Sequence, residues 1–349
     1  MQKDAAYVSD SMAQTLHYIF SKKNISDHEE GKFMKIVDMH CDTLIEGWRH
    51  PERSFYDGDT SINLKLLQEN NSLLQFFAMY LSRNEMKTMD PYDILKGIYG
   101  YYCDQMKEYS DIIRPCLSYS DIEKNKETGI ISSLLTVEDG VFLDGKIERI
   151  QEVYDMGVRL ITLMWNFENS VGFPCSDNYD DHRKGLKHFG FETVEMMNEL
   201  GMIIDVSHMS EGGFYDVAKH SKAPFVASHS CAMELCPHRR NLTDDQLKTL
   251  GNAGGIVGVN FECSFLKKDS HYATYDQIIE HLLYMKNRAG IESIGFGSDF
   301  DGIDDNGELG NYAGFTTLLE RMEKYFTYDE IDKIASKNAL RVIKDVLGK

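Results

Sequence analysis

Residues 35–44, with the sequence KIVDMHCDTL, begin as a short apolar strand and end in two side chains that can bind a metal ion. Residues two apart on a strand point to the same side, so we expect His40 and Asp42 to project together from its end. An imidazole beside a carboxylate can form half of a metal site. The same alternation turns Cys41 to the opposite face, where we expect it to pack in the core.

The pattern of that stretch recurs along the chain: a β-rich apolar run is followed by a polar loop and a helical segment. The apolar runs are 35–40, 73–81, 129–138, 158–165, 202–208, 224–229, 255–261 and 293–299. The predicted helices are 146–156, 183–200, 211–220, 243–250 and 275–289, with two closing helices in 328–347. Strands that alternate with helices imply a parallel sheet, and eight such units in roughly 300 residues fit a closed (β/α)8 TIM barrel. An open doubly wound sheet is the alternative, but no G-x-G-x-x-G follows the first run, which weakens a dinucleotide-binding version.

The organisation of the 349-residue chain follows from the same pattern. We expect residues 34–349 to form a single (β/α)8 domain. Residues 1–33 are polar and mixed in composition, and we interpret them as an N-terminal extension, disordered or helical, with a short amphipathic helix at 12–20. The segments 82–128 and 165–182 are predicted to be the longer, less regular connections, and loops of that length are usually functional or mobile.

Charge and cysteine usage limit the class of protein. The formal net charge is −19 and the isoelectric point is about 5.0, which argues against nucleic acid and anionic membrane surfaces as partners. The seven cysteines are odd in number and contain no C-x-x-C pair, which fits a reduced, intracellular protein. No run reaches the ~18 apolar residues of a membrane-spanning helix. We also recognise no signal peptide, so we expect a cytoplasmic protein without a membrane partner.

Polar residues of metal-binding type stand at the ends of the predicted strands. In a barrel the active site lies at the C-terminal ends of the strands, so these residues converge if the sheet closes. They are His40, Asp42, Glu138, His208, His229 and Asp299. Four further histidines, at positions 182, 188, 220 and 238, are interpreted as ordinary loop or core residues.

The types of ligand suggest two cations. We expect His40 and Asp42 to bind one, His208 and His229 to bind the other, and Glu138 to bridge them with its two oxygens. Nitrogen and oxygen ligands without thiolate suit zinc, with manganese or cobalt as alternatives. Two metals about 3.5–4 Å apart can share a water and lower its pKa to near neutral, which supplies a hydroxide nucleophile.

An acid–base group is needed to move protons in such a reaction. Asp299 comes first after the last apolar run, and we expect it to take the proton from the water and pass it to the leaving group. Asp301, two residues later, is the competing candidate.

Four motifs resemble the membrane dipeptidase family, also called renal dipeptidase, over about residue 34 to the C-terminus. They are DMHCDT at 38–43, IDVSH at 204–208, ASHSCA with CPHRRNLTD within 227–244, and GSDFDG at 297–302. The resemblance implies a metal-dependent (β/α)8 hydrolase of the wider amidohydrolase group that cleaves dipeptides, including those with a C-terminal D-residue. It implies the same metal ligands, with two Zn²⁺ per chain bridged by Glu138 and a water or hydroxide, and Asp299 as the acid–base group. It further implies that Arg240 holds the substrate carboxylate. This role suits arginine, because a guanidinium can donate two parallel hydrogen bonds to a carboxylate.

The sequence departs from the mammalian members of that family at Trp165, where they have a histidine that contacts the substrate. Similar bacterial-type sequences carry Trp-Asn here, so we expect either Trp165 or Asn166 to take over part of that contact. The alternative is that this subgroup stabilises the transition state differently. Members of the family often pair as dimers, and a homodimer is the corresponding expectation.

Two other functions remain as alternatives. One is another amidohydrolase-type reaction, on a lactone or a cyclic amide, although such sites usually begin with His-x-His and this one begins with His-x-Asp. The other is a catalytically silent metal-binding module, which would be expected to have lost a ligand or the aspartate.

Overall fold

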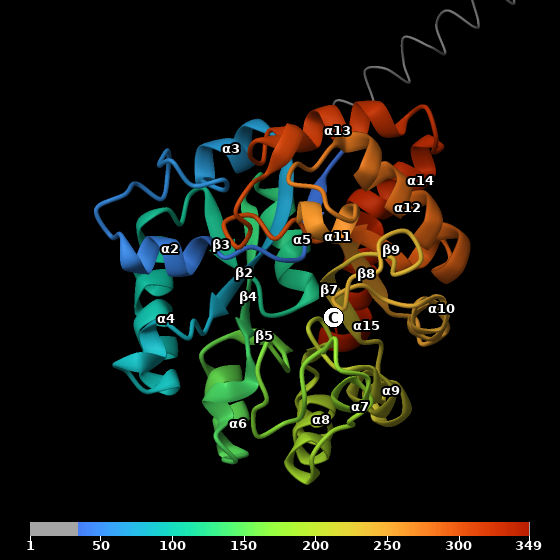
Figure 1. Cartoon of the computed structure of the whole chain (residues 1–349). Coiled ribbons are helices and arrows are strands. Elements are labelled where there is room, and N and C mark those ends of the chain that lie inside the picture. The colour runs from blue at the N-terminus through green and yellow to red at the C-terminus, as the bar shows by residue number, and fades with distance from the viewer. Residues whose placement is uncertain (1–33, 349) are drawn as a thin grey trace, which may run out of the picture.

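The computed structural model describes residues 34–348, and within that range nine parallel strands form one sheet. Eight of them close into a barrel, because β2 pairs with β4 and joins the two ends of the sheet. These strands are β1 (Ile36–Asp38), β2 (Ser72–Tyr80), β4 (Ile131–Glu138), β5 (Val158–Thr162), β6 (Ile203–Asp205), β7 (Val226–Ser230), β8 (Ile256–Val259) and β9 (Ile294–Phe296). Each coincides with one of the eight predicted apolar runs, although β2 and β7 extend one residue beyond theirs, and helices surround them (Figure 1). The predicted (β/α)8 TIM barrel is therefore confirmed.

The ninth strand, β3 (Ile113–Pro115), was not predicted. It shares one edge of β4 with β5: β3 pairs with residues 131–133 of β4, and β5 pairs with residues 135–138. The other edge of β4 pairs with β2 over seven residues. Thus β3 extends the sheet outside the barrel without interrupting its closure.

The predicted helices are present and follow the strands around the barrel. They correspond to α6 (Glu148–Asp155), α8 (His188–Leu200), α9 (Glu211–His220), α10 (Asp244–Asn252) and α12 (Tyr275–Ala289). The prediction for α8 began five residues too early. Capping boxes start α10 and α12, in which the side chains of Thr243 and Thr274 each accept a hydrogen bond from the backbone N–H three residues later.

The prediction that 82–128 is an irregular connection is wrong. This segment contains α4 (Pro91–Glu108), β3 and α5 (Tyr119–Glu127). Asp90 caps α4 by accepting from the backbone N–H of Tyr92, and Pro91 occupies the first turn. The buried stripe of α4 is diluted by Gly97, Gly100 and several tyrosines, which hid its helical period in the sequence. The segment 165–182 is irregular as predicted, apart from the one-turn helix α7 (Tyr179–His182).

The remaining helices lie near the two ends of the barrel strands or follow the last strand. They are α2 (Thr43–Arg49), α3 (Leu64–Glu69), α11 (Cys263–Leu266), α13 (Gly314–Met322), α14 (Tyr328–Asp332) and α15 (Asn338–Leu347). The two closing helices predicted in 328–347 are α14 and α15, which one π-helical segment, Lys333–Lys337, joins without a break.

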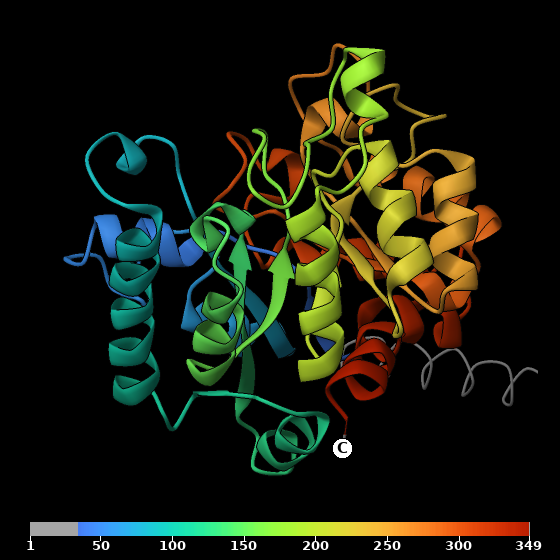
Figure 2. The ribbon, with the colours of Figure 1, turned by 90° about the horizontal axis from the view of Figure 1, so that it is seen from below.

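The N-terminal end of the barrel is closed by α15. Its Ala339, Val342 and Ile343 belong to the same buried cluster as Ile203 and Val226, the first residues of β6 and β7. Figure 2 shows this red helix at the end of the barrel opposite the strand arrowheads. The end that remains available for a binding site is therefore the C-terminal one, where α7 also lies.

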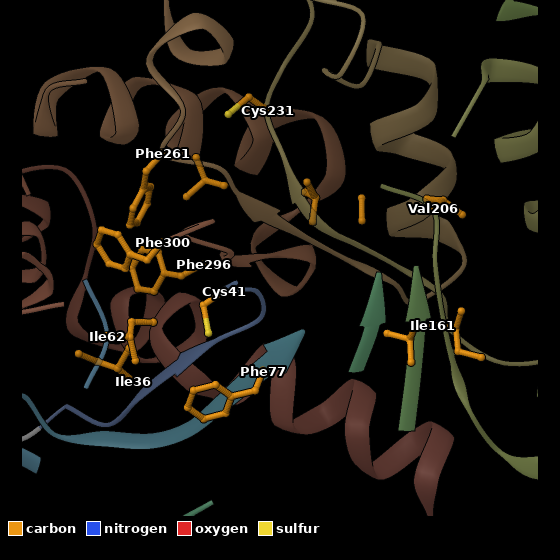
Figure 3. Close-up of a cluster of buried hydrophobic side chains, with 14 of the residues drawn as sticks. Ile36, Cys41, Ile62, Phe77, Ile161, Val206, Cys231, Phe261, Phe296 and Phe300 are labelled. Carbon is orange, nitrogen blue, oxygen red and sulfur yellow. The ribbon is translucent and has the colours of Figure 1, made fainter. Parts of the chain in front are cut away.

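Cys41 faces the core, as predicted. It is fully buried in a cluster with Phe77 and Phe296 (Figure 3), and its Sγ donates to the carbonyl oxygen of Phe76 at 3.3 Å. The chain continues in extended form here, because Cys41 makes a parallel bridge with Phe300, so Cys41 points away from the face that His40 and Asp42 share.

Residues 1–33, with the helix predicted at 12–20, lie outside the described residues. Among residues 34–348, no helix has both the length and the apolar content that crossing a membrane requires.

Candidate active site

His40 lies at the centre of a cluster of carboxylates at the C-terminal end of the barrel. Its Nε2 is 3.9 Å from Oδ1 of Asp42, 3.6 Å from Oε2 of Glu138 and 3.6 Å from Oδ1 of Asp299. His40 and Asp299 follow β1 and β9, which are neighbours in the barrel, and Glu138 is the last residue of β4. Closure of the sheet thus brings together side chains from distant parts of the sequence.

Two further histidines face the other oxygen of the same glutamate. Oε1 of Glu138 is 3.0 Å from Nε2 of His208 and 3.5 Å from Nε2 of His229. His208 follows β6, and His229 lies in β7. The six residues predicted at strand ends therefore meet in one cluster, and Glu138 presents one oxygen to His40 and the other to His208 and His229.

The second nitrogen of each of these two histidines is already engaged. Nδ1 of His208 lies 3.0 Å from Oδ1 of Asn166, and Nδ1 of His229 lies 2.7 Å from Oγ of Ser228. An amide oxygen can only accept, so the hydrogen-bond network assigns a proton to Nδ1 of His208 and a lone pair to its Nε2. The two Nε2 atoms are 3.0 Å apart and point into the cluster, where lone pairs can bind a cation.

The donor set fits metal ions. Ligand atoms of His40, Glu138 and His229 all lie within 4.8 Å of one another, as do those of His40, Asp42 and Asp299. Nε2 of His40 and Oδ1 of Asp42 are buried, and neither has a hydrogen-bond partner within the described part of the chain. Such buried, unpaired donors and acceptors are costly unless a ligand satisfies them.

A glycine keeps the space beside these carboxylates open. A Cβ atom on Gly302 would lie 2.3 Å from Oδ2 of Asp42 and 2.7 Å from Oδ1 of Asp299, closer than atoms can approach. Any larger residue at this position would displace one of the two carboxylates.

Burial shifts the pKa values of the carboxylates upward. It raises the pKa of Glu138 and Asp42 well above the ordinary range, and the neighbouring negative charges add to the effect. Burial also raises the pKa of Asp299 to about 6, against the hydrogen bond from Asn260, which lowers it. A bound cation would favour the ionised forms, which are the forms that bind metal.

Burial shifts the pKa values of the histidines downward. It lowers the pKa of His40 to about 4; the negative charge of Asp205 opposes this shift and the positive charge of Arg240 adds to it. The pKa values of His208 and His229 are lowered well below the ordinary value, again first by burial. All three imidazoles are therefore neutral near pH 7, as metal ligands must be.

Asp299 and Asp301 have different surroundings. Oδ2 of Asp299 accepts from Nδ2 of Asn260 at 2.9 Å, which leaves Oδ1 facing His40. Asp301 is already occupied, because it accepts from Oγ1 of Thr43 at 2.6 Å and from the backbone N–H of Ser61 at 2.7 Å. This contrast favours Asp299 over Asp301 as the acid–base group.

Some site residues have a left-handed backbone. The φ angles of His208 and Asp299 are +65° and +63°, and Asp139, directly after Glu138, has +82°. L-residues rarely adopt this region because Cβ approaches the carbonyl oxygen. Two of the residues with this backbone, His208 and Asp299, belong to the cluster around Glu138 and His40.

Arg240 lies beside the cluster in a nearly buried position, with 5% of its surface exposed. Its Nη2 donates to the carbonyl oxygen of His229 at 3.1 Å, and its guanidinium lies 5.4 Å from the ring centroid of Phe265. Its Nε is buried and has no hydrogen-bond partner among residues 34–348. A buried cation with an unused donor is suited to an anionic ligand.

Trp165 and Asn166 line a cavity of about 390 Å³ at the mouth of the cluster. Trp165 packs against Tyr80, with ring centroids 5.1 Å apart, and forms part of the wall. The oxygen of Asn166, in contrast, is used by His208, so this residue touches a candidate metal ligand rather than offering that oxygen to a substrate.

Sequence reasoning missed several residues that shape the site. Tyr80 and Glu262 line the cavity, and Asn260 holds Asp299. Tyr80 ends β2, Asn260 directly follows β8, and Glu262 is the third residue after β8. The rule that site residues stand at the ends of barrel strands would have found them, had it been applied to every strand.

Comparisons with known proteins agree with this geometry. A family model described as membrane dipeptidase (peptidase family M19) matches residues 30–347. An uncharacterized protein in the pqqA 5′ region of Klebsiella pneumoniae is 37% identical over 265 residues, which cover 74% of this chain and 97% of that protein. An uncharacterized dipeptidase of Schizosaccharomyces pombe is 31% identical over 339 residues, which cover 90% of this chain and 80% of that protein.

Solved structures share the fold. The crystal structure of a metallo peptidase from Rhodobacter sphaeroides, liganded with a phosphinate mimic of the dipeptide L-Ala-D-Ala, has a TM-score of 0.84 and 23% sequence identity. The match covers 90% of this chain and 99% of that chain.

Proposed function

Because the chain belongs to the membrane dipeptidase family, peptidase family M19, and is therefore a metal-dependent dipeptidase, we propose how its own residues perform the hydrolysis. In this proposal two zinc ions bind in the cluster. The ligands of the first are His40, Asp42 and Glu138, and those of the second are Glu138, His208 and His229.

One observation carries this proposal: the two oxygens of Glu138 face different sets of imidazoles. Oε2 faces His40 at 3.6 Å, while Oε1 faces His208 at 3.0 Å and His229 at 3.5 Å. A carboxylate in this arrangement can be a ligand of two cations, with one oxygen for each. The nitrogen and oxygen donors, without thiolate, suit zinc.

When bound, the pair of cations supplies a water of lowered pKa and polarises the peptide carbonyl. Asp299 accepts the proton that the attacking water loses and donates it to the leaving amine. Its Oδ1 is available because Asn260 holds only Oδ2. Bound cations favour the ionised form of Asp299, which is the form that accepts the proton from the water, and its Oδ1 faces His40 at 3.6 Å.

Arg240 binds the C-terminal carboxylate of the substrate in this proposal. The buried guanidinium with an unpaired Nε supports the assignment. Such an anchor limits the enzyme to short substrates, because the carboxylate must lie close to the peptide bond that is cleaved. Trp165 contacts the substrate as part of the cavity wall, and its indole N–H is a further donor. Asn166 contributes through His208.

The test uses the purified full chain, a metal-content measurement and a panel of substrates. We expect about two zinc ions per chain and hydrolysis of dipeptides, with loss of activity on chelation and recovery on adding zinc. The panel includes L- and D-residues at the C-terminal position, because the Rhodobacter sphaeroides relative is liganded with a mimic of L-Ala-D-Ala.

Two results would contradict the proposal. One is a chain that holds less than one metal ion and cleaves no dipeptide. The other is hydrolysis of lactones or cyclic amides in preference to dipeptides, which would favour a different amidohydrolase-type reaction.

A further inference from the structure

Asp205, the last residue of β6, is a fully buried carboxylate behind the proposed metal ligands. Its Oδ1 accepts from the backbone N–H groups of Ser207 and Ser228, both at 2.9 Å. Its Oδ2 accepts from Oγ1 of Thr162 at 2.6 Å and from Oγ of Ser228 at 2.5 Å. Four donors therefore surround this carboxylate. Within residues 34–348, none of its hydrogen bonds comes directly from a histidine.

Ser228 connects Asp205 to His229. Its Oγ lies 2.5 Å from Oδ2 of Asp205 and 2.7 Å from Nδ1 of His229. A hydroxyl has a single hydrogen, and an ionised carboxylate can only accept. The hydroxyl hydrogen therefore points to Asp205, and Ser228 must accept from His229.

The direction of these bonds decides which nitrogen of His229 carries the proton. Because Ser228 accepts, the proton is on Nδ1, and Nε2 has a lone pair directed toward Glu138 and His208. The two histidines thus reach the same tautomer by different means: an amide oxygen accepts from His208, while a hydroxyl accepts from His229 only as long as a carboxylate takes its hydrogen.

We propose that Asp205, acting through Ser228, is a positioning residue that sets the tautomer of His229 and so keeps its Nε2 free to bind metal. The proposal rests on the proposed function in one respect, namely that His229 is a metal ligand. Asp205 does not touch the substrate in it.

Asp205 also has a structural role, and the test must separate this role from the proposed effect on the tautomer of His229. The register of β6 and β7 contains one paired position, Asp205 with Val226, and the backbone N–H of Val206 donates to the carbonyl oxygen of Val226 beside it. The bond from the backbone N–H of Ser228 to Oδ1 of Asp205 adds a further link between these strands. A variant that simply deletes the side chain would lose both roles.

Asp205→Asn separates the two roles because asparagine has the same shape. Its oxygen can still accept both backbone N–H groups, while its NH₂ group replaces Oδ2 and donates to Ser228. The hydroxyl of Ser228 then has two acceptors in reach, Nδ1 of His229 at 2.7 Å and Oγ of Ser207 at 3.3 Å. We expect it to donate to the nearer one, Nδ1 of His229, which moves the proton of the imidazole to Nε2. The variant is therefore expected to hold the strands together but to present the wrong tautomer, in the way that removing a buried aspartate does in other enzymes.

Two more variants complete the set. Ser228→Ala removes the connection and leaves His229 free to adopt either tautomer. Thr162→Val is the matched control, because it removes the other hydroxyl donor from the same Oδ2 and has no contact with His229 in the hydrogen-bond network.

The first measurement is ¹⁵N NMR of the histidine-labelled, metal-free full chain, in which protonated and unprotonated ring nitrogens have distinct shifts. We expect His229 to carry its proton on Nδ1 in the wild type and Thr162→Val, and on Nε2 in Asp205→Asn. The second is zinc affinity by competition with a chelator. Partners of metal-binding histidines typically change affinity about 10- to 100-fold, so we expect about a 100-fold loss at one site for Asp205→Asn and about 10-fold for Ser228→Ala. For Thr162→Val we expect a loss below about threefold, because the bond to His229 remains.

A folded Asp205→Asn that keeps the proton on Nδ1 and binds zinc as the wild type does would overturn the proposal. Equal losses in Asp205→Asn and Thr162→Val would also overturn it, because they would indicate a general loss of packing. If Asp205→Asn does not fold, Ser228→Ala decides, and wild-type affinity in that variant refutes the connection. Failure of the proposed function is distinguishable, since a wild type without zinc binding or dipeptide cleavage would still give a tautomer in the metal-free spectrum.

Discussion

Replacing Asp299 with asparagine should remove most of the turnover and leave the metal content unchanged. Asparagine has the same shape and tolerates the left-handed backbone of this position, where φ is +63°. Its oxygen can still accept the hydrogen bond from Asn260, so the side chain stays in place. What the variant cannot do is take up and return a proton.

The size of the effect follows from that loss. A positioned acid–base group typically contributes about 10²- to 10⁴-fold to the rate. At 1.36 kcal/mol for each factor of ten, the barrier should rise by about 3–5 kcal/mol. The loss should fall on kcat rather than KM, because Arg240, which we propose as the substrate anchor, is unchanged.

Asp301→Asn is the matched control, since Asp301 has the same left-handed backbone and lies two residues away. It accepts from Thr43 and Ser61, so its replacement should cost stability, by about 1.5–3 kcal/mol for a buried bond to a charged group, and leave kcat close to the wild-type value. The assay compares kcat, KM, zinc content and urea unfolding for the three proteins. Full kcat in Asp299→Asn, or a large loss of kcat in Asp301→Asn alone, would refute the assignment.

Other outcomes are expected at the substrate anchor, the metal cluster and the core. Arg240→Met should lower kcat/KM for dipeptides by about 30-fold or more, equivalent to about 2 kcal/mol, and affect dipeptide amides much less; similar losses on both would count against a carboxylate contact. At a free zinc concentration of 100 times the Kd of a site, removing zinc from that site should lower the unfolding free energy by about 2.7 kcal/mol. An unchanged unfolding curve would exclude a metal bound to the folded state. Burial lowers the pKa of His281 below its usual 6.5, against the hydrogen bond to Leu266, which raises it, so the stability it contributes is present above pH 6.5 and is lost as pH falls through the lowered value. His281→Gln should therefore flatten the fall of the unfolding free energy as the pH drops below 6.5, and a slope equal to that of the wild type would assign the acid sensitivity to other groups.

The barrel could be predicted from the sequence because its strands are buried on both faces. Strands such as β2 and β4 are buried along almost their whole length. Apolar residues dominate β2, and β4 has an apolar centre, so both stand out as strand-like segments in the sequence. In contrast, β3 has three residues, and its Arg114 and Pro115 are exposed, so nothing in its composition marks a strand. A short strand of this kind forms because a neighbouring edge is available, and that edge exists only in the folded chain.

The types of residue in the site could also be predicted, because they stand at the ends of recognisable strands. Their partners could not. Asn166 meets His208 across 42 positions of sequence, and Asn260 meets Asp299 across 39. The expectation that Asn166 contacts the substrate rests on the resemblance to bacterial-type sequences with Trp-Asn at this position. Which of two neighbouring polar side chains turns to the cavity and which turns to a ligand depends on the backbone angles of the loop.

The left-handed residues of the site have a consequence for how this protein could be changed by selection or design. At such φ angles an L-residue costs about 1–2 kcal/mol that glycine avoids, so positions 208 and 299 are places where the fold alone would prefer glycine. Glycine there would remove an imidazole and a carboxylate from the cluster. A search for thermostable variants that scores only folding should therefore select against activity at these two positions, and they are the ones to hold fixed in any engineered library.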